Sequence, residues 1–506
     1  MSDNYLKMIL NSRVYDVASE TPLDYAKNLS RRLSNDVWLK REDLQPVFSF
    51  KLRGAYNKIA RLSDAECANG VIAASAGNHA QGVALAAQHR DIKALIVMPR
   101  TTPAIKVAAV QALGGKTLLR GDTYDEAYTH ALQLADERQM VFIHPYDDPD
   151  VIAGQGTIAM ELLRQHHGEL HAVFVPVGGG GLIAGVSAYI KALRADIRVI
   201  GAEPEDAPSM YEALKHKRRV VLDQVGIFAD GAAVRQAGKE PYRLARKYVD
   251  EVVLVSTDEI CAATKDIFDD TRAMAEPAGA LAVAAIKKYV EQNGVEGESL
   301  IAINSGANIN FDRLRHVAER AEIGERREAL LAVTIPERPG SFLKFCRAIG
   351  KRGITEFNYR YADASEAHVF AGVQLSRGYE ERDELLDKLR AEGYPVVDMT
   401  ENEMAKTHIR FMVGGRSHNL QNEVLYRFEF PERPGALLKF LTSMGKRWNI
   451  SLFHYRNHGA AYGRVLVGIQ VPGDDRKRLQ SFLDELGYIY FEELENPAYS
   501  LFLGNG

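Results

Sequence analysis

Cysteine is scarce in this sequence, and its three copies, Cys67, Cys261 and Cys346, lie far apart. An odd number of widely spaced cysteines provides neither a disulfide framework nor the paired spacing of a thiolate metal site. We expect the three thiols to be buried as small apolar side chains. The pattern is typical of a reducing compartment and predicts a cytoplasmic protein.

Long hydrophobic runs and a strong net charge are also missing. No stretch approaches the ~18 apolar residues that a spanning helix needs, and residues 1–7 lack the basic start and apolar core of a signal peptide. A formal net charge of −4 is too small to indicate nucleic acid or an anionic membrane as a partner. A small molecule is therefore the expected partner.

The chain is long enough for two to four domains, because it has 506 residues, of which 46% are hydrophobic and 26% charged. From about residue 35 to 305, short β-branched apolar runs alternate with longer helical segments. This alternation predicts parallel sheets covered on both faces, a three-layer α/β architecture. The predicted strands are 71–74, 94–98, 117–119, 173–177, 199–202, 252–255 and 300–303, and the predicted helices include 78–89, 104–113 and 123–139.

Lys51 lies in the first turn of a predicted helix, within the sequence Phe48-Ser-Phe-Lys-Leu-Arg-Gly54. The positive end of a helix dipole favours the neutral amine, which is the form that attacks a carbonyl. An ordinary solvated lysine would show the same local pattern. The decision therefore depends on neighbouring motifs, of which the first is Ser75-Ala76-Gly77-Asn78-His79. We expect His79, at the start of a helix, to be a packed or capping residue rather than a catalytic one.

Four consecutive glycines, Gly178 to Gly181, separate a buried strand from a predicted helix. Such glycines let several backbone N–H groups converge at the helix N-terminus, where a phosphate is stabilised. A flexible linker would not be flanked by core residues on both sides. Ser305 follows the apolar run 300–303 and is predicted to lie at the C-terminal end of a strand, where open α/β sheets bind ligands.

The glycine run also fits a dinucleotide-binding fingerprint. Gly179 to Ala184 matches G-x-G-x-x-G/A, and Glu203 follows 19 residues after Ala184, as a ribose-binding acid would. A NAD-dependent dehydrogenase is therefore an alternative, but it leaves Lys51, residues 75–79 and Ser305 without a role. His166, His167 and His171 have metal-like spacing, yet they read as a helix end and an exposed loop, so we predict no metal site.

Taken together, these motifs resemble the fold-type II pyridoxal-phosphate enzymes, the family of tryptophan synthase β and the serine/threonine dehydratases. From about residue 5 to the C-terminus, the chain is similar to the biosynthetic threonine deaminases within that family. The resemblance implies that Lys51 carries pyridoxal 5'-phosphate and later removes the substrate Cα proton. It further implies cofactor contacts from Phe50 (ring), Asn78 (phenolic oxygen), Gly178, Gly179, Gly180, Gly181 and Leu182 (phosphate) and Ser305 (pyridine nitrogen), and substrate contacts from Ser75, Ala76, Gly77 and Asn78.

The implied reaction is the conversion of L-threonine to 2-oxobutanoate and ammonia, the committed step of isoleucine biosynthesis. Related racemases carry a serine at the position of Ala76, and alanine has no proton to give, which favours a dehydratase. A serine dehydratase or another lyase of the same fold is the nearer alternative, because one methyl group changes binding by only ~1–3 kcal/mol. In this family Glu203 could help to hold a cation, or it could simply line the cleft.

An internal repeat follows the Arg/Glu-rich segment 316–328. Residues 336–345 return as residues 431–440, with eight of ten positions identical. Each copy reads as the ferredoxin-like order strand, helix, strand, strand, helix, strand. The pair resembles ACT-like modules, which bind free amino acids in that family. We therefore expect an effector site near the turns Pro339-Gly340 and Pro434-Gly435.

The resemblance implies isoleucine as an inhibitor, possible antagonism by valine, and a homotetramer. Two other roles stay open: the modules could serve only oligomer contacts, or the chain could be an amino-acid sensor with an inactive catalytic half. The predicted domains are a catalytic domain at 1–317, a linker at 318–328, a first module at 329–400, a connecting segment at 401–423 and a second module at 424–506.

Overall fold

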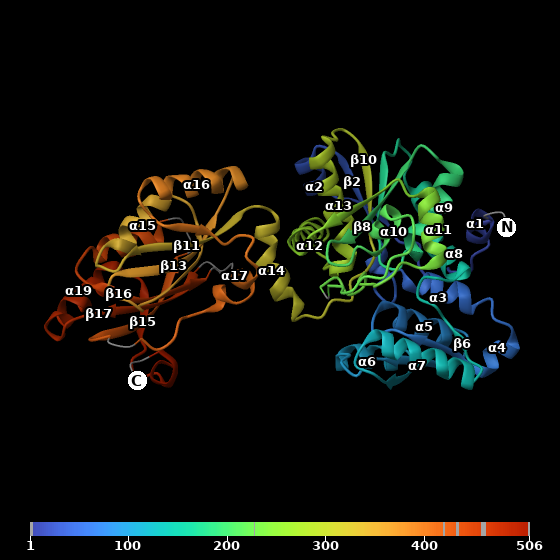
Figure 1. The fold of residues 1–506 in the computed structure, drawn as a ribbon, viewed down its shortest axis with the longest axis horizontal. Coiled ribbons are helices and arrows are strands. Elements are labelled where there is room, and N and C mark those ends of the chain that lie inside the picture. The colour runs from blue at the N-terminus through green and yellow to red at the C-terminus, as the bar shows by residue number, and fades with distance from the viewer. Residues whose placement is uncertain (1–3, 227, 418–419, 432–434, 457–461, 504–506) are drawn as a thin grey trace. The chain divides into compact units, whose positions relative to one another are not determined.

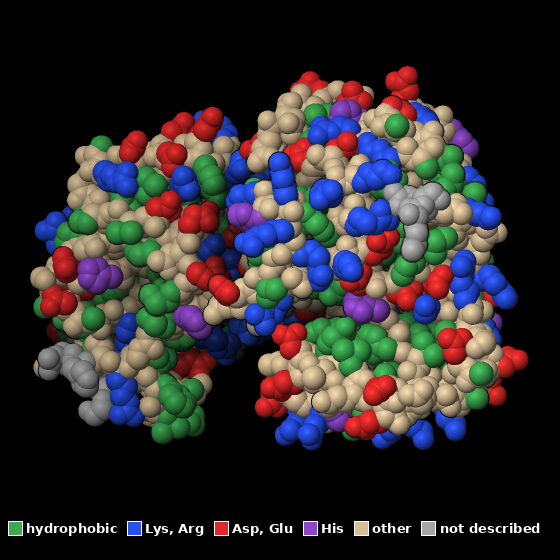
Figure 2. All heavy atoms as spheres, turned by 45° about the vertical axis from the view of Figure 1, so that its right-hand side comes forward, with side chains coloured by type: hydrophobic (Ala, Val, Ile, Leu, Met, Phe, Trp, Pro, Cys, Tyr) green, Lys and Arg blue, Asp and Glu red, His purple; other side chains and the backbone are tan. Residues whose placement is uncertain are grey.

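The computed structural model describes residues 4–226, 228–417, 420–431, 435–456 and 462–503. The chain forms two compact units, Met1–Gly324 and Glu325–Gly506 (Figure 1). Within the described ranges, no helix is both long and apolar enough to cross a lipid bilayer. On the face drawn in Figure 2, acidic and basic side chains are interspersed on both units.

The first unit contains two sheets, in agreement with the predicted α/β architecture. The smaller sheet has four parallel strands in the order β5-β4-β3-β6, and the larger has six strands in the order β1-β2-β10-β7-β8-β9, with only β1 antiparallel. The strands are β1 (Leu23–Tyr25), β2 (Asp36–Arg41), β3 (Val71–Ala74), β4 (Ala94–Met98), β5 (Lys116–Leu119), β6 (Val141–Phe142), β7 (Ala172–Pro176), β8 (Arg198–Pro204), β9 (Glu251–Val255) and β10 (Ser299–Asn304).

Helices cover both faces of the larger sheet, as the side-chain alternation of β7 shows. Val173 and Val175 pack in one cluster with residues of α8 and α9, whereas Ala172 and Phe174 pack in another with residues of α12 and α13. The helices of this unit are α1 (Tyr5–Leu10), α2 (Lys27–Leu33), η1 (Glu42–Leu44), α3 (Lys51–Ile59), α4 (Asp64–Asn69), α5 (Asn78–His89), α6 (Ala104–Ala112), α7 (Tyr124–Glu137), α8 (Pro149–Gln165), α9 (Gly181–Leu193), α10 (Ser209–Lys215), α11 (Lys239–Tyr248), α12 (Thr257–Thr271), α13 (Pro277–Asn293) and α14 (Arg313–Gly324).

The segment predicted as a linker, 318–328, is mostly helix. α14 extends to Gly324, and Arg320 donates from Nε to Asp258 Oδ1 of α12 at 2.5 Å. Lys265 of α12 pairs with Glu322 of α14. The charged segment reads from sequence as a linker or a connecting helix, and two of its residues, Arg320 and Glu322, pair with α12; residues 325–327 separate α14 from the next strand.

The second unit is one antiparallel sheet of eight strands in the order β14-β11-β13-β12-β16-β17-β15-β18. Its first half runs β11 (Glu328–Pro336), α15 (Ser341–Ile349), β12 (Ile354–Arg360), β13 (Glu366–Gln374), α16 (Tyr379–Ala391) and β14 (Val396–Asp398). The second half runs β15 (Glu423–Pro431), α18 (Ala436–Met444), β16 (Asn449–Arg456), β17 (Tyr462–Gln470), η3 (Gly473–Asp475), α19 (Arg476–Leu486) and β18 (Ile489–Glu492), and the remaining short elements are α17 (Glu403–Thr407), η2 (Ile409–Phe411) and η4 (Tyr499–Leu503). Both halves have the predicted ferredoxin-like order.

The two halves join where β12 pairs with β16. The register runs from Glu356 opposite Arg456 to Arg360 opposite Leu452, so the pairing is centred on Asn358 opposite His454, which are equivalent positions of the two copies. Of the three cysteines, all free, Cys261 and Cys346 are buried as expected, whereas Cys67 is only half-buried.

Candidate active site

The backbone of Lys51, the first residue of α3, is held by close packing of two neighbouring helices. A Cβ atom added to Gly82 of α5 would lie 3.0 Å from the Leu52 nitrogen, and one added to Gly54 would lie 2.7 Å from the Val151 carbonyl oxygen of α8. Only glycine allows these approaches. α5 and α8 therefore fix the start of α3, and with it the position of Lys51.

The Lys51 amine lies in a desolvated pocket. Its Nζ donates to the Pro145 carbonyl oxygen at 3.4 Å and lies 5.2 Å from the centre of the Phe50 ring. Burial lowers the pKa of Lys51 to about 8, while the charge of Glu276 acts in the opposite direction. About a tenth of the amine is therefore neutral at pH 7, far more than for an ordinary lysine, and the neutral form is the one that a nucleophile or a base requires.

Asn78, the first residue of α5, is held on both sides of its amide. Its Nδ2 donates to Glu276 Oε1 at 2.6 Å, and its Oδ1 accepts from Asn308 Nδ2 at 2.7 Å. Asn308 also donates to the Val47 carbonyl oxygen at 2.8 Å. The loops after β3 and β10 therefore meet at this amide.

The glycine run lies between the end of β7 and the start of α9. Gly180 has a φ of 92°, which favours glycine. A Cβ atom on Gly179 would lie 2.2 Å from Cγ of Tyr146, and one on Gly178 would lie 3.0 Å from Cα of Ala232. Side chains are thus excluded here, and bare backbone N–H groups stand at the N-terminus of a thirteen-residue helix. Such a cradle fits a phosphate group.

Ser305 lies directly after β10 and next to the Lys51 segment. The Phe50 N–H donates to its carbonyl oxygen at 3.2 Å, and Ser49 forms a β-bridge with Gly306. The Ser305 hydroxyl is buried and contacts only the Ala278 carbonyl oxygen, at 3.4 Å, among the described partners. This long contact leaves the hydroxyl able to bond a ring nitrogen.

The predicted substrate loop, Ser75, Ala76 and Gly77, joins β3 to α5 and is half-buried. The Gly77 N–H donates to Ser75 Oγ at 3.2 Å, so this N–H is used within the loop and the Ser75 hydroxyl proton stays available. The loop ends at Asn78, which connects it to Glu276.

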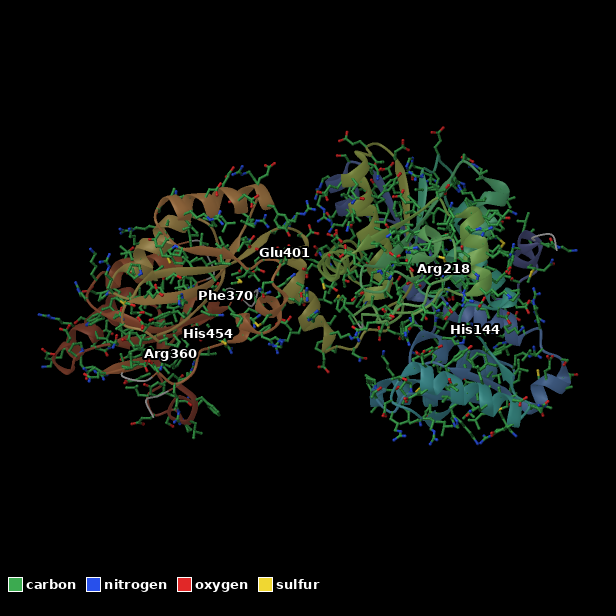
Figure 3. All side chains as sticks on the ribbon, viewed as in Figure 1. His144, Arg218, Arg360, Phe370, Glu401 and His454 are labelled. Atoms are coloured by element: carbon green, nitrogen blue, oxygen red, sulfur yellow. The ribbon has the colours of Figure 1, made fainter. Side chains whose placement is uncertain are left out.

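Residues 145 and 146 link Lys51 to the glycine run. Pro145 accepts from the Lys51 amine, and the ring of the next residue, Tyr146, lies over Gly179. His144, labelled in Figure 3, packs edge-to-face on Tyr146 with ring centres 4.7 Å apart. The structure therefore brings Phe50, Lys51, Asn78, the glycines and Ser305 into one region.

Four other positions singled out in the sequence have structural roles. His79 is buried, bonds the Ile143 carbonyl oxygen at 2.8 Å, and burial lowers its pKa to about 3, so it is the packed residue that we expected. Glu203 accepts from the Met210 and Tyr211 N–H groups at the start of α10, each at 2.8 Å. His166 and His171 bond separate partners, Ser299 and Tyr289. In the part of the chain that the structure describes, no group of three or more His, Cys, Asp or Glu residues could hold a metal ion.

No role is predicted from the sequence for Glu276 or Asn308, which bond the two ends of the Asn78 amide, or for Tyr146. Glu276 precedes Pro277 at the start of α13 and resembles an ordinary helix-start residue. No local pattern marks it as part of the site, because its partner Asn78 lies 198 positions away in sequence.

The chain is similar to known proteins in family, in sequence and in structure. The family model described as "Pyridoxal-phosphate dependent enzyme" matches residues 14–306, and the one described as "C-terminal regulatory domain of Threonine dehydratase" matches residues 319–409 and 414–503. L-threonine dehydratase biosynthetic IlvA of Burkholderia multivorans is 58% identical over 505 residues, covering 99% of each chain. The protein of the same name from Escherichia coli is 55% identical over 500 residues, covering 99% of this chain and 97% of that one.

Among the solved structures that resemble this chain, two cover about three fifths of its length. The processed form of threonine deaminase isoform 2 from Solanum lycopersicum has a TM-score of 0.62 and 51% identity, covering 63% of this chain and 94% of that one. Maize serine racemase has a TM-score of 0.59 and 31% identity, covering 62% of this chain and 96% of that one.

Proposed function

Because this chain belongs to the pyridoxal-phosphate-dependent threonine dehydratases, with their C-terminal regulatory domain, we propose that it is a threonine ammonia-lyase that converts L-threonine to 2-oxobutanoate and ammonia. The observation that carries this function is the desolvated amine of Lys51, which is joined through Pro145 and Tyr146 to a cradle of bare glycines. A nicotinamide dinucleotide could use the glycine cradle, but it would leave the Lys51 amine without a role, and Glu203, the candidate ribose ligand, is occupied in capping α10.

Several side chains suit the cofactor. Bound pyridoxal phosphate would supply a carbonyl for the substrate amine and a ring that withdraws electrons from the Cα–H bond. The N–H groups of Gly178 to Leu182 would hold its phosphate, the second N–H of Asn78 Nδ2 its phenolic oxygen, and the Ser305 hydroxyl its ring nitrogen. Phe50 would pack beside the ring.

Lys51 would carry the cofactor and then take the Cα proton, since a pKa of about 8 leaves part of the amine neutral. The substrate carboxylate would bind at the loop Ser75 to Asn78. Ala76 stands where related racemases carry a serine, and alanine has no proton to give at that position, which favours loss of the β-hydroxyl over racemisation. L-Serine would react by the same steps, because the extra methyl of threonine is worth only ~1–3 kcal/mol in a pocket.

Colour and turnover test this function together. The purified protein should be yellow, absorbing near ~410 nm, and Lys51→Ala should lose both the colour and threonine turnover. Lys58→Ala, a half-buried lysine on the same helix, is the matched control and should keep both. A colourless parent protein, or a reductively trapped cofactor on a lysine other than Lys51, would refute the assignment.

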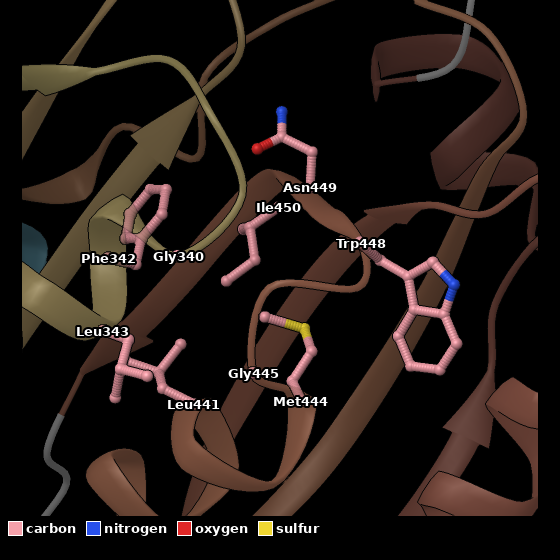
Figure 4. A pocket seen from close by; sticks show the side chains of 9 residues that line it. All are labelled: Gly340, Phe342, Leu343, Leu441, Met444, Gly445, Trp448, Asn449 and Ile450. Carbon is pink, nitrogen blue, oxygen red and sulfur yellow. The ribbon is translucent and has the colours of Figure 1, made fainter.

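For the second unit, we propose that isoleucine inhibits by binding a cavity between the two repeats (Figure 4). The cavity is narrow and holds about one water molecule as it stands, so a ligand would have to widen it. Its lining is mostly apolar and comes from α15, α18 and the start of β16: Gly340, Phe342, Leu343, Leu441, Met444, Gly445, Trp448, Asn449 and Ile450. Figure 4 shows Leu343 and Leu441 approaching each other from α15 and α18.

One end of this cavity is polar. Asn449 donates to Glu337 Oε1 at 2.7 Å, and Tyr359 donates to the other carboxylate oxygen. A carboxylate suits the ammonium group of an amino acid, and the apolar walls suit a branched aliphatic side chain. This position agrees with the predicted turn at Pro339-Gly340, whereas Pro434 of the second predicted turn lies outside the described residues.

Filling the cavity tests the effector site. Leu343→Trp should raise the isoleucine concentration for half inhibition at least tenfold and leave the uninhibited rate close to that of the parent. Met404→Trp, which adds the same ring at a largely exposed position of the same unit, should change neither. Equal isoleucine sensitivity in all three proteins would exclude this cavity as the effector site.

Valine as an opposing effector, a homotetramer and a cytoplasmic location are further parts of the proposal that rest on the resemblance to the family. Valine differs from isoleucine by one methylene and would enter the same apolar cavity. Mass measurement of the native protein with and without isoleucine tests the subunit number.

A further inference from the structure

Glu276 is a buried acid whose carboxyl group is enclosed by three loops of the active site. Only 4% of the residue is exposed, and its backbone N–H donates to the Gly306 carbonyl oxygen at 3.0 Å. A Cβ atom on Gly306 would lie 2.7 Å from Glu276 Oε1, and one on Gly231 would lie 3.5 Å from it. Two glycines thus leave the space that this carboxyl group occupies.

The carboxyl group determines which way the Asn78 amide points. An ionised carboxylate only accepts hydrogen bonds, so the Asn78 nitrogen must face Glu276, while the Asn308 Nδ2 donor must face the Asn78 oxygen. An amide nitrogen carries two N–H groups, and Glu276 uses one of them. The second is left for the cleft, where the proposed function needs a donor.

The same carboxyl group belongs to the charged surroundings of Lys51. Burial raises the pKa of Glu276 to about 7, with Asp230 acting in the same direction and the Asn78 hydrogen bond and Lys106 acting against it. Lys106 itself pairs with Asp230 at 2.8 Å. The charge of Glu276 in turn favours the protonated form of Lys51.

The other titratable groups near Lys51 are neutral in the relevant range. Burial lowers the pKa of His79 to about 3 and that of His144 to about 4. Glu276 and Lys51 are therefore the two groups of this pocket whose charges change around neutral pH.

We propose that Glu276 is a positioning residue of the reaction, an inference that rests on the proposed function. It fixes the Asn78 amide and supplies negative charge to the surroundings of the Lys51 amine. When Lys51 takes up the Cα proton it becomes an ammonium group, and the Glu276 carboxylate stabilises that charge. The acid contacts neither substrate nor cofactor and acts through Asn78 and Lys51.

The test separates these two effects with two variants of the full-length chain. Glu276→Gln keeps the size and a hydrogen-bond acceptor but removes the charge. In the cofactor-free protein, acetylation of Lys51 by acetic anhydride, followed by peptide mass spectrometry across pH, reports the pKa of the amine. We expect the midpoint of Glu276→Gln to fall by roughly one pH unit or more, the effect of losing an opposite charge nearby. Glu203→Gln, which removes another buried acid that does not contact Lys51 or Asn78, should leave the midpoint unchanged.

Glu276→Asp keeps the charge but draws it back from Asn78. Its Lys51 midpoint should stay within half a pH unit of the parent, while cofactor affinity, measured by absorbance titration, should fall at least fivefold. A Glu276→Gln protein that melts at the parental temperature and keeps the parental midpoint would overturn the electrostatic role. Parental cofactor affinity in Glu276→Asp would overturn the positioning role. If Glu276→Gln does not fold, the cofactor affinity of Glu276→Asp alone decides whether the proposal stands.

These readouts are independent of substrate. A parent protein that does not turn over threonine would refute the proposed function, whereas an unchanged Lys51 midpoint would refute the role of Glu276 alone.

Discussion

Replacing Arg53 by methionine should destabilise the first unit by about 3–5 kcal/mol. Arg53 lies two residues after Lys51 and is fully buried. Its guanidinium donates to both oxygens of Glu42 at 2.8 Å and to the two oxygens of Glu161 at 2.6 and 3.0 Å. Lys40, also buried, lies 2.6 Å from Glu161. Two cations and two carboxylates therefore balance inside the protein.

The magnitude follows from this balance. Removing Arg53 leaves two buried carboxylates with one cation, and an uncompensated buried charge costs about 3–5 kcal/mol. The double variant Arg53→Met/Glu42→Gln leaves a neutral Lys40–Glu161 pair, so it should be more stable than Arg53→Met alone. Lys58→Met is the control on the same helix. Its partly exposed pairs with Asp148 and Asp150 are worth about 0–1 kcal/mol.

Urea unfolding followed by tryptophan fluorescence measures these differences. The sequence has two tryptophans, Trp38 in the first unit and Trp448 in the second. In a Trp448→Phe background, the signal comes from the first unit alone. An Arg53→Met protein no less stable than Lys58→Met, or a double variant whose losses simply add, would refute the reasoning.

The pH dependence gives a second check. In the parent, burial acts to raise the pKa of Glu161, but the ion pairs with Arg53 and Lys40 together outweigh it and the net shift is downward. This contribution to stability is present above the unfolded pKa and is lost as the pH falls. Without Arg53 the carboxyl group would take up a proton more readily. The stability difference between parent and Arg53→Met should therefore shrink between pH 8 and pH 5.5, and an equal difference at both pH values would contradict the charge argument.

Two further predictions concern the site itself. Gly179→Ala should weaken cofactor binding at least tenfold in an absorbance titration. The new Cβ would lie 2.2 Å from the Tyr146 ring, and such overpacking costs about 1–3 kcal/mol. The control is Gly473→Ala, where no atom lies within 4 Å of the added Cβ, and it should bind the cofactor normally. Lys106→Met should move the acid limb of kcat/KM to higher pH, because Lys106 lowers the pKa of Glu276, whereas Lys106→Arg should keep the parental profile. An unmoved limb in Lys106→Met would show that Glu276 does not set it.

The fold of the first unit could largely be predicted from the alternation of apolar runs. β3, β4, β7 and β10 were each predicted within two residues of their observed ends. β2 was not predicted, because Lys40 and Arg41 interrupt its apolar pattern, although both are buried and paired with acids. From sequence alone, a charged strand residue that is buried in an ion pair cannot be told from an exposed one, because its partner is not known.

The convergence of the site was predictable for a different reason. Lys51, Asn78, the glycines and Ser305 each lie at the start of a helix or the end of a strand, and parallel sheets collect such positions at one edge. Glu276 and Tyr146 could not be found in this way. Their roles come from contacts between loops, which neither periodicity nor spacing encodes.

The repeat explains why the proposed effector cavity needs both modules. Phe342 and Leu343 come from the first copy, and Leu441, Met444 and Trp448 come from the second, so neither copy alone forms the walls. The pairing of β12 with β16 makes the two copies one sheet, and the Glu337–Asn449 hydrogen bond crosses between them near the cavity. A ligand that enters must push α15 and α18 apart or shear that strand pair, and either movement changes the whole regulatory unit rather than one module.

Glu337→Gln would keep the hydrogen bond to Asn449 but remove the charge for an ammonium group, so it should weaken isoleucine inhibition. The unfolding midpoint of the unit should stay unchanged, as reported by Trp448 fluorescence in a Trp38→Phe background. Parental isoleucine sensitivity in that variant would mean that the effector ammonium binds elsewhere.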